Sequence, residues 1–263
     1  MFILGERING MFKDIGQGIR EHDPKPLIEW AIKQKEGGAH YLDINTGPSS
    51  DDQVKDLPWM VSVVKEASDL PLVMDSTNPE AIEAALAAYG KPGALINSCE
   101  CEQAKMDIFF PMAAKYKAGV ICLCLNKKGI PKSAEDRVAM AAELVANAMG
   151  YDLSPDDLWI DPICMPVNVA QEHAIEVLET LRQVKMISNP APLTTCGLSN
   201  TSQKSPYRSI INRTFAVMAM ACGLDSAICD ANDDELVDAI ATARIILNKD
   251  IYCDSYAKVF RHR

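Results

Sequence analysis

The sequence predicts an α/β fold, a single (β/α)8 TIM barrel that spans residues 1–263. A short apolar run that ends in a polar residue occurs eight times, about 20 to 40 residues apart. Segments with helical periodicity lie between these runs, and no linker, low-complexity tract or charge run divides the chain. Eight near-continuous apolar strands that alternate with helices most simply close into one barrel.

The eight expected strands are rich in β-branched and apolar residues, and each ends at a polar side chain. In chain order they cover residues 2–5, 40–45, 71–74, 93–96, 119–125, 158–160, 193–198 and 226–229. The first strand is expected to end at Glu6 and Arg7.

Capping signals mark the start or end of several expected helices. These signals are Gly37-Gly38 after residues 27–36, residues 76–80 before Ala81, Ser133 with Asp136 before residues 140–149, and Asp233 before residues 236–247. The segment 215–222 has two methionines at core spacing and is expected to pack inside the fold. A doubly wound open sheet is the alternative architecture, and the lack of a G-x-G-x-x-G turn after the first strand weakens it.

Composition limits the partners and the compartment. The net charge of −10 argues against nucleic acid as the main partner, because phosphate binding needs a basic face. No apolar stretch approaches the length of a membrane span, and no signal peptide is expected at the N-terminus. The nine cysteines are an odd number and fit reduced, buried thiols in a cytoplasmic protein, so no metal site is expected. The C-x-C pairs Cys99/Cys101 and Cys122/Cys124 leave a zinc thiolate site as the alternative.

The barrel predicts where function lies, because active sites of this fold sit at the C-terminal ends of the strands. The polar residues at those ends are carboxylates and carboxamides: Asp43, Asn45, Asp75, Asn97, Asn126, Asp161, Asn200 and Asp230. The set contains no His or Lys, so it does not indicate a Schiff-base or His-metal site. Asp and Asn together can hydrogen-bond the edge of a flat heterocycle that carries amino, imino and carbonyl groups, as a pterin does.

A series of sequence blocks, in order along essentially the whole chain, identifies a family. They are Glu6-Arg-Ile-Asn-Gly-Met-Phe, Leu42-Asp-Ile-Asn-Thr-Gly-Pro, Met74-Asp-Ser-Thr-Asn, Ile96-Asn-Ser, Asn126-Lys-Lys-Gly-Ile-Pro, Ile160-Asp-Pro, Asn168-Val-Ala-Gln, Gly197-Leu-Ser-Asn with Ser202-Gln, Ile211-Asn-Arg-Thr-Phe and Tyr252-Cys-Asp-Ser. With these blocks the sequence resembles the corrinoid-dependent methyltetrahydrofolate methyltransferases. The resemblance implies a homodimer of (β/α)8 barrels that binds tetrahydrofolate or 5-methyltetrahydrofolate as substrate.

The resemblance also implies roles for individual residues. The pterin-binding residues of the family fall on Asp75, Asn97 and Asp161, and the asparagine that reaches nitrogen 5 of the folate falls on Asn200. Further binding residues are expected on the same loop as Asn200, at Ser199, Gln203 and Arg208. The match loosens around Lys204, where the loop is expected to contact either the folate tail or the partner protein.

Methyl transfer between nitrogen 5 of the folate and the cobalt of a corrinoid is the activity that the resemblance implies, in a direction that the sequence leaves open. The corrinoid is expected on a separate protein, because no D-x-H-x-x-G cobalt-ligand motif is present. Asn200 is expected to donate the hydrogen bond that strengthens as the bond to nitrogen 5 breaks. The alternatives are another pterin-barrel enzyme such as dihydropteroate synthase, or a non-catalytic pterin-binding subunit of a corrinoid complex.

Overall fold

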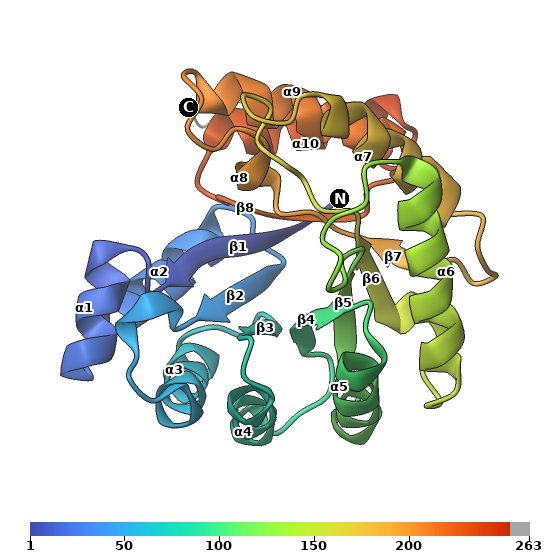
Figure 1. Ribbon diagram of the computed structural model, residues 1–263. Helices are drawn as coiled ribbons and strands as arrows, with labels where there is room; N and C mark the ends of the chain where they lie inside the picture. The colour runs from blue at the N-terminus through green and yellow to red at the C-terminus, as the bar shows by residue number, and fades with distance from the viewer. Residues whose placement is uncertain (253–263) are drawn as a thin grey trace.

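Eight parallel strands form the centre of the molecule in a computed structural model that describes residues 1–252 (Figure 1). The strands are β1(Phe2–Asn9), β2(Tyr41–Asn45), β3(Leu72–Asp75), β4(Leu95–Glu100), β5(Gly119–Leu123), β6(Leu158–Asp161), β7(Leu193–Thr194) and β8(Ser226–Cys229). All eight strands predicted from the sequence are present. Their order, β7-β6-β5-β4-β3-β2-β1-β8, brings the last two strands of the chain to the two ends of the sheet.

The sheet closes between these two ends. The chain just beyond β7 meets β8 at a parallel bridge between Gly197 and Ile228, and the backbone N–H of Ile228 donates to the carbonyl of Cys196 at 2.9 Å. The fold is therefore a (β/α)8 barrel, and the open-sheet alternative is excluded.

Helices surround the barrel and connect successive strands (Figure 1). They are α1(Lys13–Glu21), α2(Lys25–Glu36), α3(Gln53–Ala67), α4(Pro79–Tyr89), α5(Gln103–Tyr116), α6(Ala134–Met149), α7(Glu172–Val184), α8(Leu198–Thr201), α9(Arg208–Ala221) and α10(Asp234–Ile246), with short 3-10 turns at Gly47–Ser49 and Pro155–Asp157. The predicted caps are confirmed: Ser133 accepts from the backbone N–H of Asp136, and Asp233 accepts from that of Leu236. In residues 1–252, no helix is both long and apolar enough to cross a membrane.

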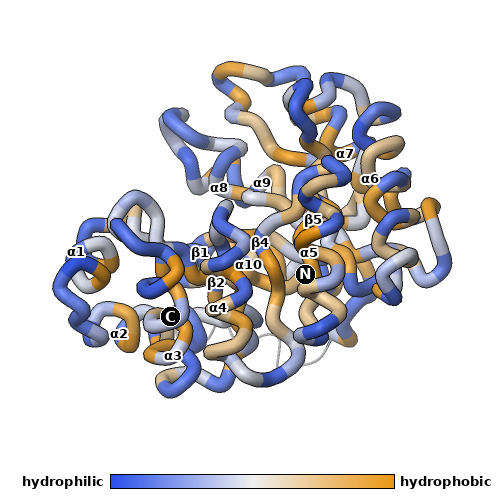
Figure 2. Tube along the Cα trace, turned by 60° about the horizontal axis from the view of Figure 1, so that its bottom comes forward, coloured by the Kyte–Doolittle hydropathy of each residue, from blue (hydrophilic) through white to orange (hydrophobic). Residues whose placement is uncertain are grey.

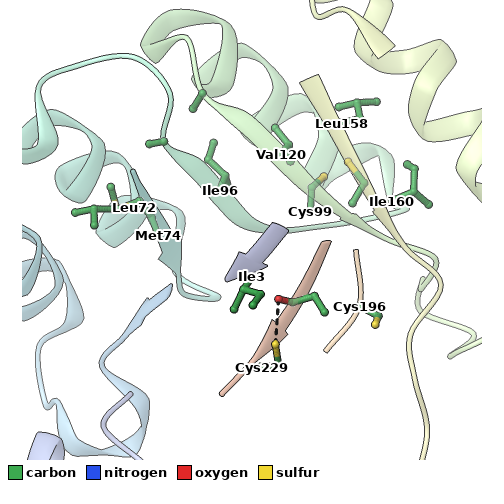
Figure 3. Close-up of a cluster of buried hydrophobic side chains, with 14 of the residues drawn as sticks. Ile3, Leu72, Met74, Ile96, Cys99, Val120, Leu158, Ile160, Cys196 and Cys229 are labelled. Atoms are coloured by element: carbon green, nitrogen blue, oxygen red, sulfur yellow. Dashed lines mark hydrogen bonds between the residues drawn. The ribbon is translucent and has the colours of Figure 1, made fainter. Parts of the chain in front are cut away.

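Two apolar layers stabilise the barrel, because successive side chains of a strand point to opposite faces of the sheet. The outward-facing side chains pack against the helices, and Figure 3 shows part of this layer, including Leu72, Ile96 and Val120. The barrel interior is filled by a separate cluster that consists of Leu4, Val73, Leu95, Ile121 and Trp159. Figure 2 shows hydrophobic stretches in the central elements and hydrophilic stretches in many outer loops.

The cysteines belong to these apolar layers, as predicted. The eight cysteines in residues 1–252 are free and buried, and Figure 3 shows Cys99, Cys196 and Cys229 among aliphatic side chains. Burial raises the pKa of Cys99 and of Cys101 to about 12, so both thiols stay protonated at neutral pH. Cys253, in the last of the sequence blocks, lies outside the described residues.

Two sequence predictions need correction. Strand β1 does not end at Glu6 and Arg7 but continues to Asn9, because the pairing of β1 with β2 shifts by one residue between Gly5 and Ile8. This bulge frees the backbone N–H of Arg7, which donates to the buried side chain of Gln34 at 2.9 Å. On α9, Met220 packs in the core as predicted, whereas Met218 is 48% exposed.

A hydrogen-bond network compensates for the shortness of β7 at the point of closure. Asp225, just before β8, accepts from the backbone N–H of Thr194 at 2.9 Å, from its hydroxyl at 3.1 Å, and from the ammonium of Lys185. Ser226 donates from its hydroxyl to the carbonyl of Thr194 at 3.0 Å. The two residues of β7 pair with β6 through the backbone on one side, and these side-chain hydrogen bonds join them to the start of β8 on the other.

Replacing Asp225 with Ala should therefore destabilise the barrel by about 1–3 kcal/mol, the usual cost of leaving buried donors without an acceptor. Asp225→Asn is the matched control, because its amide oxygen can still accept from Thr194. Urea denaturation of both variants measures the effect. An alanine variant as stable as wild type would show that the network does not support closure.

Candidate active site at the strand ends

Three polar residues lie at one level of the barrel, at the ends of β2 and β3 and partway along β4, which continues to Glu100. Asn45, Asp75 and Asn97 are partners in register across these neighbouring strands. Alternation along β3 and β4 places Asp75 and Asn97 on the same face as Val73 and Leu95, which fill the barrel interior. The candidate site thus lies directly above the interior apolar cluster.

Asp75 is fixed by its neighbour on β2. The amide of Asn45 donates to Asp75 at 2.6 Å, and the amide oxygen of Asn45 accepts from the backbone N–H of Gly47 at 2.6 Å. This second bond orients the Asn45 amide so that its N–H groups face Asp75. Burial raises the pKa of Asp75 to about 6, and the hydrogen bond from Asn45 opposes the rise. Asp75 and Asn97 together line a small cavity of about 50 Å³.

Asp43 lies in the barrel interior on β2 and was not assigned to the binding site from the sequence. It is 3% exposed and accepts a hydrogen bond from the amide of Asn97 at 3.0 Å. Burial and the nearby charge of Asp75 raise its pKa well above the usual range. The sequence signal was available, because Asp43 follows Tyr41 and precedes Asn45 at the two-residue spacing of one strand face.

Asp161 ends β6 and connects that strand to the segment carrying Asn200. It is 7% exposed, and its carboxylate accepts from the backbone N–H of Ile163 at 2.7 Å and from that of Gly197. Burial raises the pKa of Asp161 to about 6, while both backbone hydrogen bonds oppose the rise. A buried carboxylate at this strand end therefore also helps to place the start of α8.

Asn200 lies on α8, a helix of four residues, with an exposed side chain. The helix begins directly after Gly197, and a Cβ atom at position 197 would lie 2.7 Å from the amide nitrogen of Asn200. Since a side chain at Gly197 would displace the Asn200 amide, the absence of one permits this close approach. The Asn200 amide therefore lies against the backbone at the end of the β7 segment.

Ser199 and Arg208 hold the loop through hydrogen bonds. The hydroxyl of Ser199 donates to the carboxyl of Glu6 at 2.8 Å. The guanidinium of Arg208 donates to the carbonyl of Ser199 at 2.9 Å and to the hydroxyl of Ser202 at 3.1 Å. Gln203, the remaining residue expected on this loop, has an exposed side chain.

Glu6 is a second functional candidate that was not assigned from the sequence. Its side chain reaches Ser199, a residue 193 positions away, and so connects β1 to α8. Burial raises the pKa of Glu6 to about 7, nearby Asp230 raises it further, and Ser199 and Arg208 oppose the rise. Spacing from Leu4 could have indicated an inward side chain, but the expected strand ended too early.

Not every polar residue at a strand end joins this group. Asn126 accepts from the backbone N–H of Lys128 at 2.9 Å, and Asp230 accepts from that of Asn232 at 2.9 Å, so each supports its own turn. In the part of the chain that the structure describes, no group of three or more His, Cys, Asp or Glu side chains is placed to hold a metal ion.

The arrangement offers mainly hydrogen-bond acceptors, with an amide that both donates and accepts. Buried carboxyls and amides at one level suit a flat, polar ring whose edge carries N–H groups and a carbonyl. Asn200 approaches from the opposite side of the barrel opening, on the segment that closes the sheet. One side of the barrel opening can thus bind the ring, while the opposite side contacts the reacting atom.

Comparisons with known proteins agree with a pterin-ring site. The family model described as "Pterin binding enzyme" matches residues 6–230. A methylcorrinoid:tetrahydrofolate methyltransferase of Eubacterium limosum is 31% identical over 263 residues, which cover 99% of this chain and 96% of that protein. The methionine synthase of Mycobacterium tuberculosis is 28% identical over 248 residues, which cover 88% of this chain but 20% of that protein.

Solved structures of dihydropteroate synthases share the fold. The enzyme of Yersinia pestis, in a structure with a pterine–sulfa conjugate, has a TM-score of 0.70 at 14% identity and covers 95% of this chain and 94% of its own. The enzyme of Xanthomonas albilineans in complex with 7,8-dihydropteroate has a TM-score of 0.66 at 17% identity, and the match covers 94% of this chain and 92% of that enzyme. At such identities the likeness shows the barrel alone.

The raised pKa of Glu6 predicts a pH dependence of stability. A carboxyl that holds its proton more tightly in the folded state stabilises that state fully below its unfolded pKa, near 4.5, and this stabilisation is lost as pH rises through about 7. Glu6→Gln cannot titrate. The free energy of unfolding of wild type should therefore fall relative to that of the variant between pH 4.5 and about 8.

Chemical denaturation across that pH range measures the difference. Replacement of the exposed Asp51 with Asn is the control and should leave the wild-type pH profile unchanged. Parallel profiles for wild type and Glu6→Gln would mean that Glu6 does not titrate near neutral pH.

Proposed function

The chain belongs to the family of pterin-binding enzymes, and we propose that it moves a methyl group between nitrogen 5 of tetrahydrofolate and the cobalt of a corrinoid carried by a partner protein. Similarity over the full length to the methyltransferase of Eubacterium limosum supports this reaction over other pterin chemistry. In this proposal residues 1–263 form one pterin-binding barrel domain, with no resident metal.

The observation that carries the proposal is the group of buried polar side chains at the strand ends. Asp75, Asn97 and Asp161 would bind the polar edge of the pterin, the carboxylates accepting from its N–H groups and Asn97 able to donate or accept. Strands fix all three, so the ring would be held in one orientation. Fixed geometry of this kind brings the reacting atoms into line at low entropic cost.

Asn200 would donate a hydrogen bond to the reacting nitrogen of the folate. When the methyl group passes to cobalt(I), the electron pair of the broken carbon–nitrogen bond stays on nitrogen 5, which takes up a proton from water, and a hydrogen bond to that atom stabilises the developing charge. In the reverse direction nitrogen 5 forms the bond to the methyl group with its electron pair and releases its proton to water. The Asn200 amide can donate throughout without changing protonation state. The partner's corrinoid supplies the cobalt that accepts or provides the methyl group.

Ser199, Gln203 and Arg208 extend the substrate-binding surface in this proposal. Ser199 and Arg208 act by fixing the backbone of α8, as their contacts with Glu6 and Ser202 indicate. Gln203 is exposed at the opening and would contact the folate directly. The neighbouring segment around Lys204 would meet the folate tail or the corrinoid protein.

The test is a spectroscopic assay with free cobalamin. Mixing the protein with methyltetrahydrofolate and cob(I)alamin should convert the visible spectrum to that of methylcobalamin, and methylcobalamin with tetrahydrofolate should reveal the reverse reaction. Folate binding without conversion in either direction would indicate a non-catalytic pterin-binding subunit. Formation of dihydropteroate from a pterin pyrophosphate and p-aminobenzoate would indicate the synthase alternative.

We also propose that the chain acts in the cytoplasm as a homodimer. Free thiols at all eight described cysteines support a reducing compartment. An apolar groove of about 1050 Å³ between α7 and α9 supports association with a second copy, and exposed Ile175, Ile210 and Met218 line it. These three side chains are 48–59% exposed in the part of the chain that the structure describes.

Charge placed in this groove should separate the protomers. Met218→Glu should give a monomer by size-exclusion chromatography with light scattering, at concentrations at which wild type is a dimer. Met186, 76% exposed and outside the groove, provides the control: Met186→Glu should remain dimeric. A monomeric wild type would contradict the proposal.

Asn200→Ala should lower the single-turnover transfer rate about 100-fold or more, because a donor that acts on developing charge contributes mainly to the transition state. The folate dissociation constant should change much less. Gly197→Ala, which displaces the Asn200 amide without removing it, should lower the same rate in the same direction. Rapid-mixing spectroscopy with cob(I)alamin and folate titration measure the two quantities. Strong loss of binding at an unchanged saturated rate would make Asn200 a binding residue only.

A further inference from the structure

Two carboxyl groups, those of Asp43 and Asp75, meet within the wall of the candidate site. They lie on neighbouring strands, and the structure places them in hydrogen-bond contact with each other. Each also accepts from a neutral amide: Asp43 from Asn97 at 3.0 Å, and Asp75 from Asn45 at 2.6 Å. Two carboxyls can hydrogen-bond only if one of them carries a proton.

The surroundings make double ionisation costly. Asp43 is 3% exposed, and the charged neighbours that act on it most strongly are Asp75 on β3 and Glu6 on β1, both acidic. Glu6 in turn faces Asp230, Arg208 and Arg7. Two like charges in contact and out of water cannot both be retained, so the pair holds one proton near neutral pH.

The hydrogen bonds indicate which carboxyl holds the proton. Asn45 is oriented by the backbone N–H of Gly47 and donates a short hydrogen bond to Asp75, which stabilises the ionised form of that carboxyl. Asp43 is more deeply buried and receives the weaker donor, at 3.0 Å from Asn97. The pKa of Asp75 is raised only to about 6, whereas that of Asp43 is raised well above its usual range. The proton therefore belongs on Asp43.

We propose that Asp43 is a positioning residue that stays protonated and donates a hydrogen bond to the Asp75 carboxylate, which holds that carboxylate as an anionic acceptor for the pterin edge. This inference rests on the proposed function in one respect, namely that Asp75 binds the ring. Asp43 itself would not touch the substrate. Its hydroxyl, with the amide of Asn45, fixes the side of Asp75 that faces the wall.

Infrared spectroscopy tests the proton directly, without folate or corrinoid. At about pH 8.5, above the pKa of about 7 for Glu6 and of about 6 for Asp75 and Asp161, those three carboxyls are largely ionised. Wild type should retain the C=O stretch of a protonated carboxyl, sensitive to deuterium exchange. Asp43→Asn should lose this band, and the control Asp161→Asn should keep it. A wild-type spectrum without the band would overturn the inference even if methyl transfer is observed.

Two substitutions then test the positioning role. Asp43→Asn replaces the hydroxyl with an amide N–H donor of similar shape and keeps an acceptor for Asn97, so folate affinity should stay within about threefold of wild type. Asp43→Ala removes the donor to Asp75, and its folate dissociation constant should rise about tenfold or more. Equal losses in both variants would show that an ionised Asp43 is required. Unchanged affinity in both would show that Asp43 does not position Asp75.

If wild-type protein binds no folate but the infrared band behaves as expected, the proposed function fails while the placement of the proton stands. If folate binds and reacts but the infrared band is absent, the proposed function stands while the placement of the proton on Asp43 fails. The thermal stability of Asp43→Ala, measured beside that of Asp43→Asn, identifies an affinity loss that arises from unfolding, and only folded variants enter the comparison.

Discussion

The structure depends on holding several carboxyl groups out of water at one end of a parallel barrel. An ionised side chain at such a place is costly unless hydrogen bonds replace its hydration or a proton neutralises it. This chain uses both solutions. Asp161 accepts from backbone N–H groups, Asp75 accepts from an amide, and Glu6 accepts from a hydroxyl. Each of the three pKa values is nevertheless raised by burial. The opening of the barrel is thus lined with acceptors of unusually high proton affinity.

The same hydrogen bonds connect the site to the closure of the barrel. Strand β7 contains only two residues, and the chain beyond it reaches β8 through the bridge at Gly197. Asp161 accepts from the backbone N–H of Gly197, and Glu6 accepts from Ser199, so β6 and β1 both hold the segment that carries Asn200. A substitution among these residues therefore affects both the completeness of the barrel and the placement of the candidate donor.

Local patterns in the sequence were sufficient for the strands and for helix caps such as Ser133 and Asp233, because apolar periodicity and capping act over a few residues. The pattern of polar residues at strand ends also identified Asp75, Asn97 and Asp161 as candidates. Glu6 was not assigned, because a bulge continues β1 past the point where its apolar run stops. The exposure of Met218 was also missed, although residues two apart on a helix lie on opposite faces, so Met218 and Met220 could not both pack in the core.

The residues of the candidate site lie on two kinds of element, rigid strands and one short helix. Asp75, Asn97 and Asp161 extend from strands whose backbone hydrogen bonds fix them on both sides, which suits groups that contact a ring unchanged during reaction. Asn200 instead lies on a four-residue helix, too short to fix its own position by repeated turns. Its placement depends on the bonds of Ser199 to Glu6 and to Arg208. A carboxylate accepts a stronger hydrogen bond than a carboxylic acid. Because the pKa of Glu6 is about 7, the strength of this support changes across the neutral range, so the acidic wall of the barrel influences the placement of Asn200.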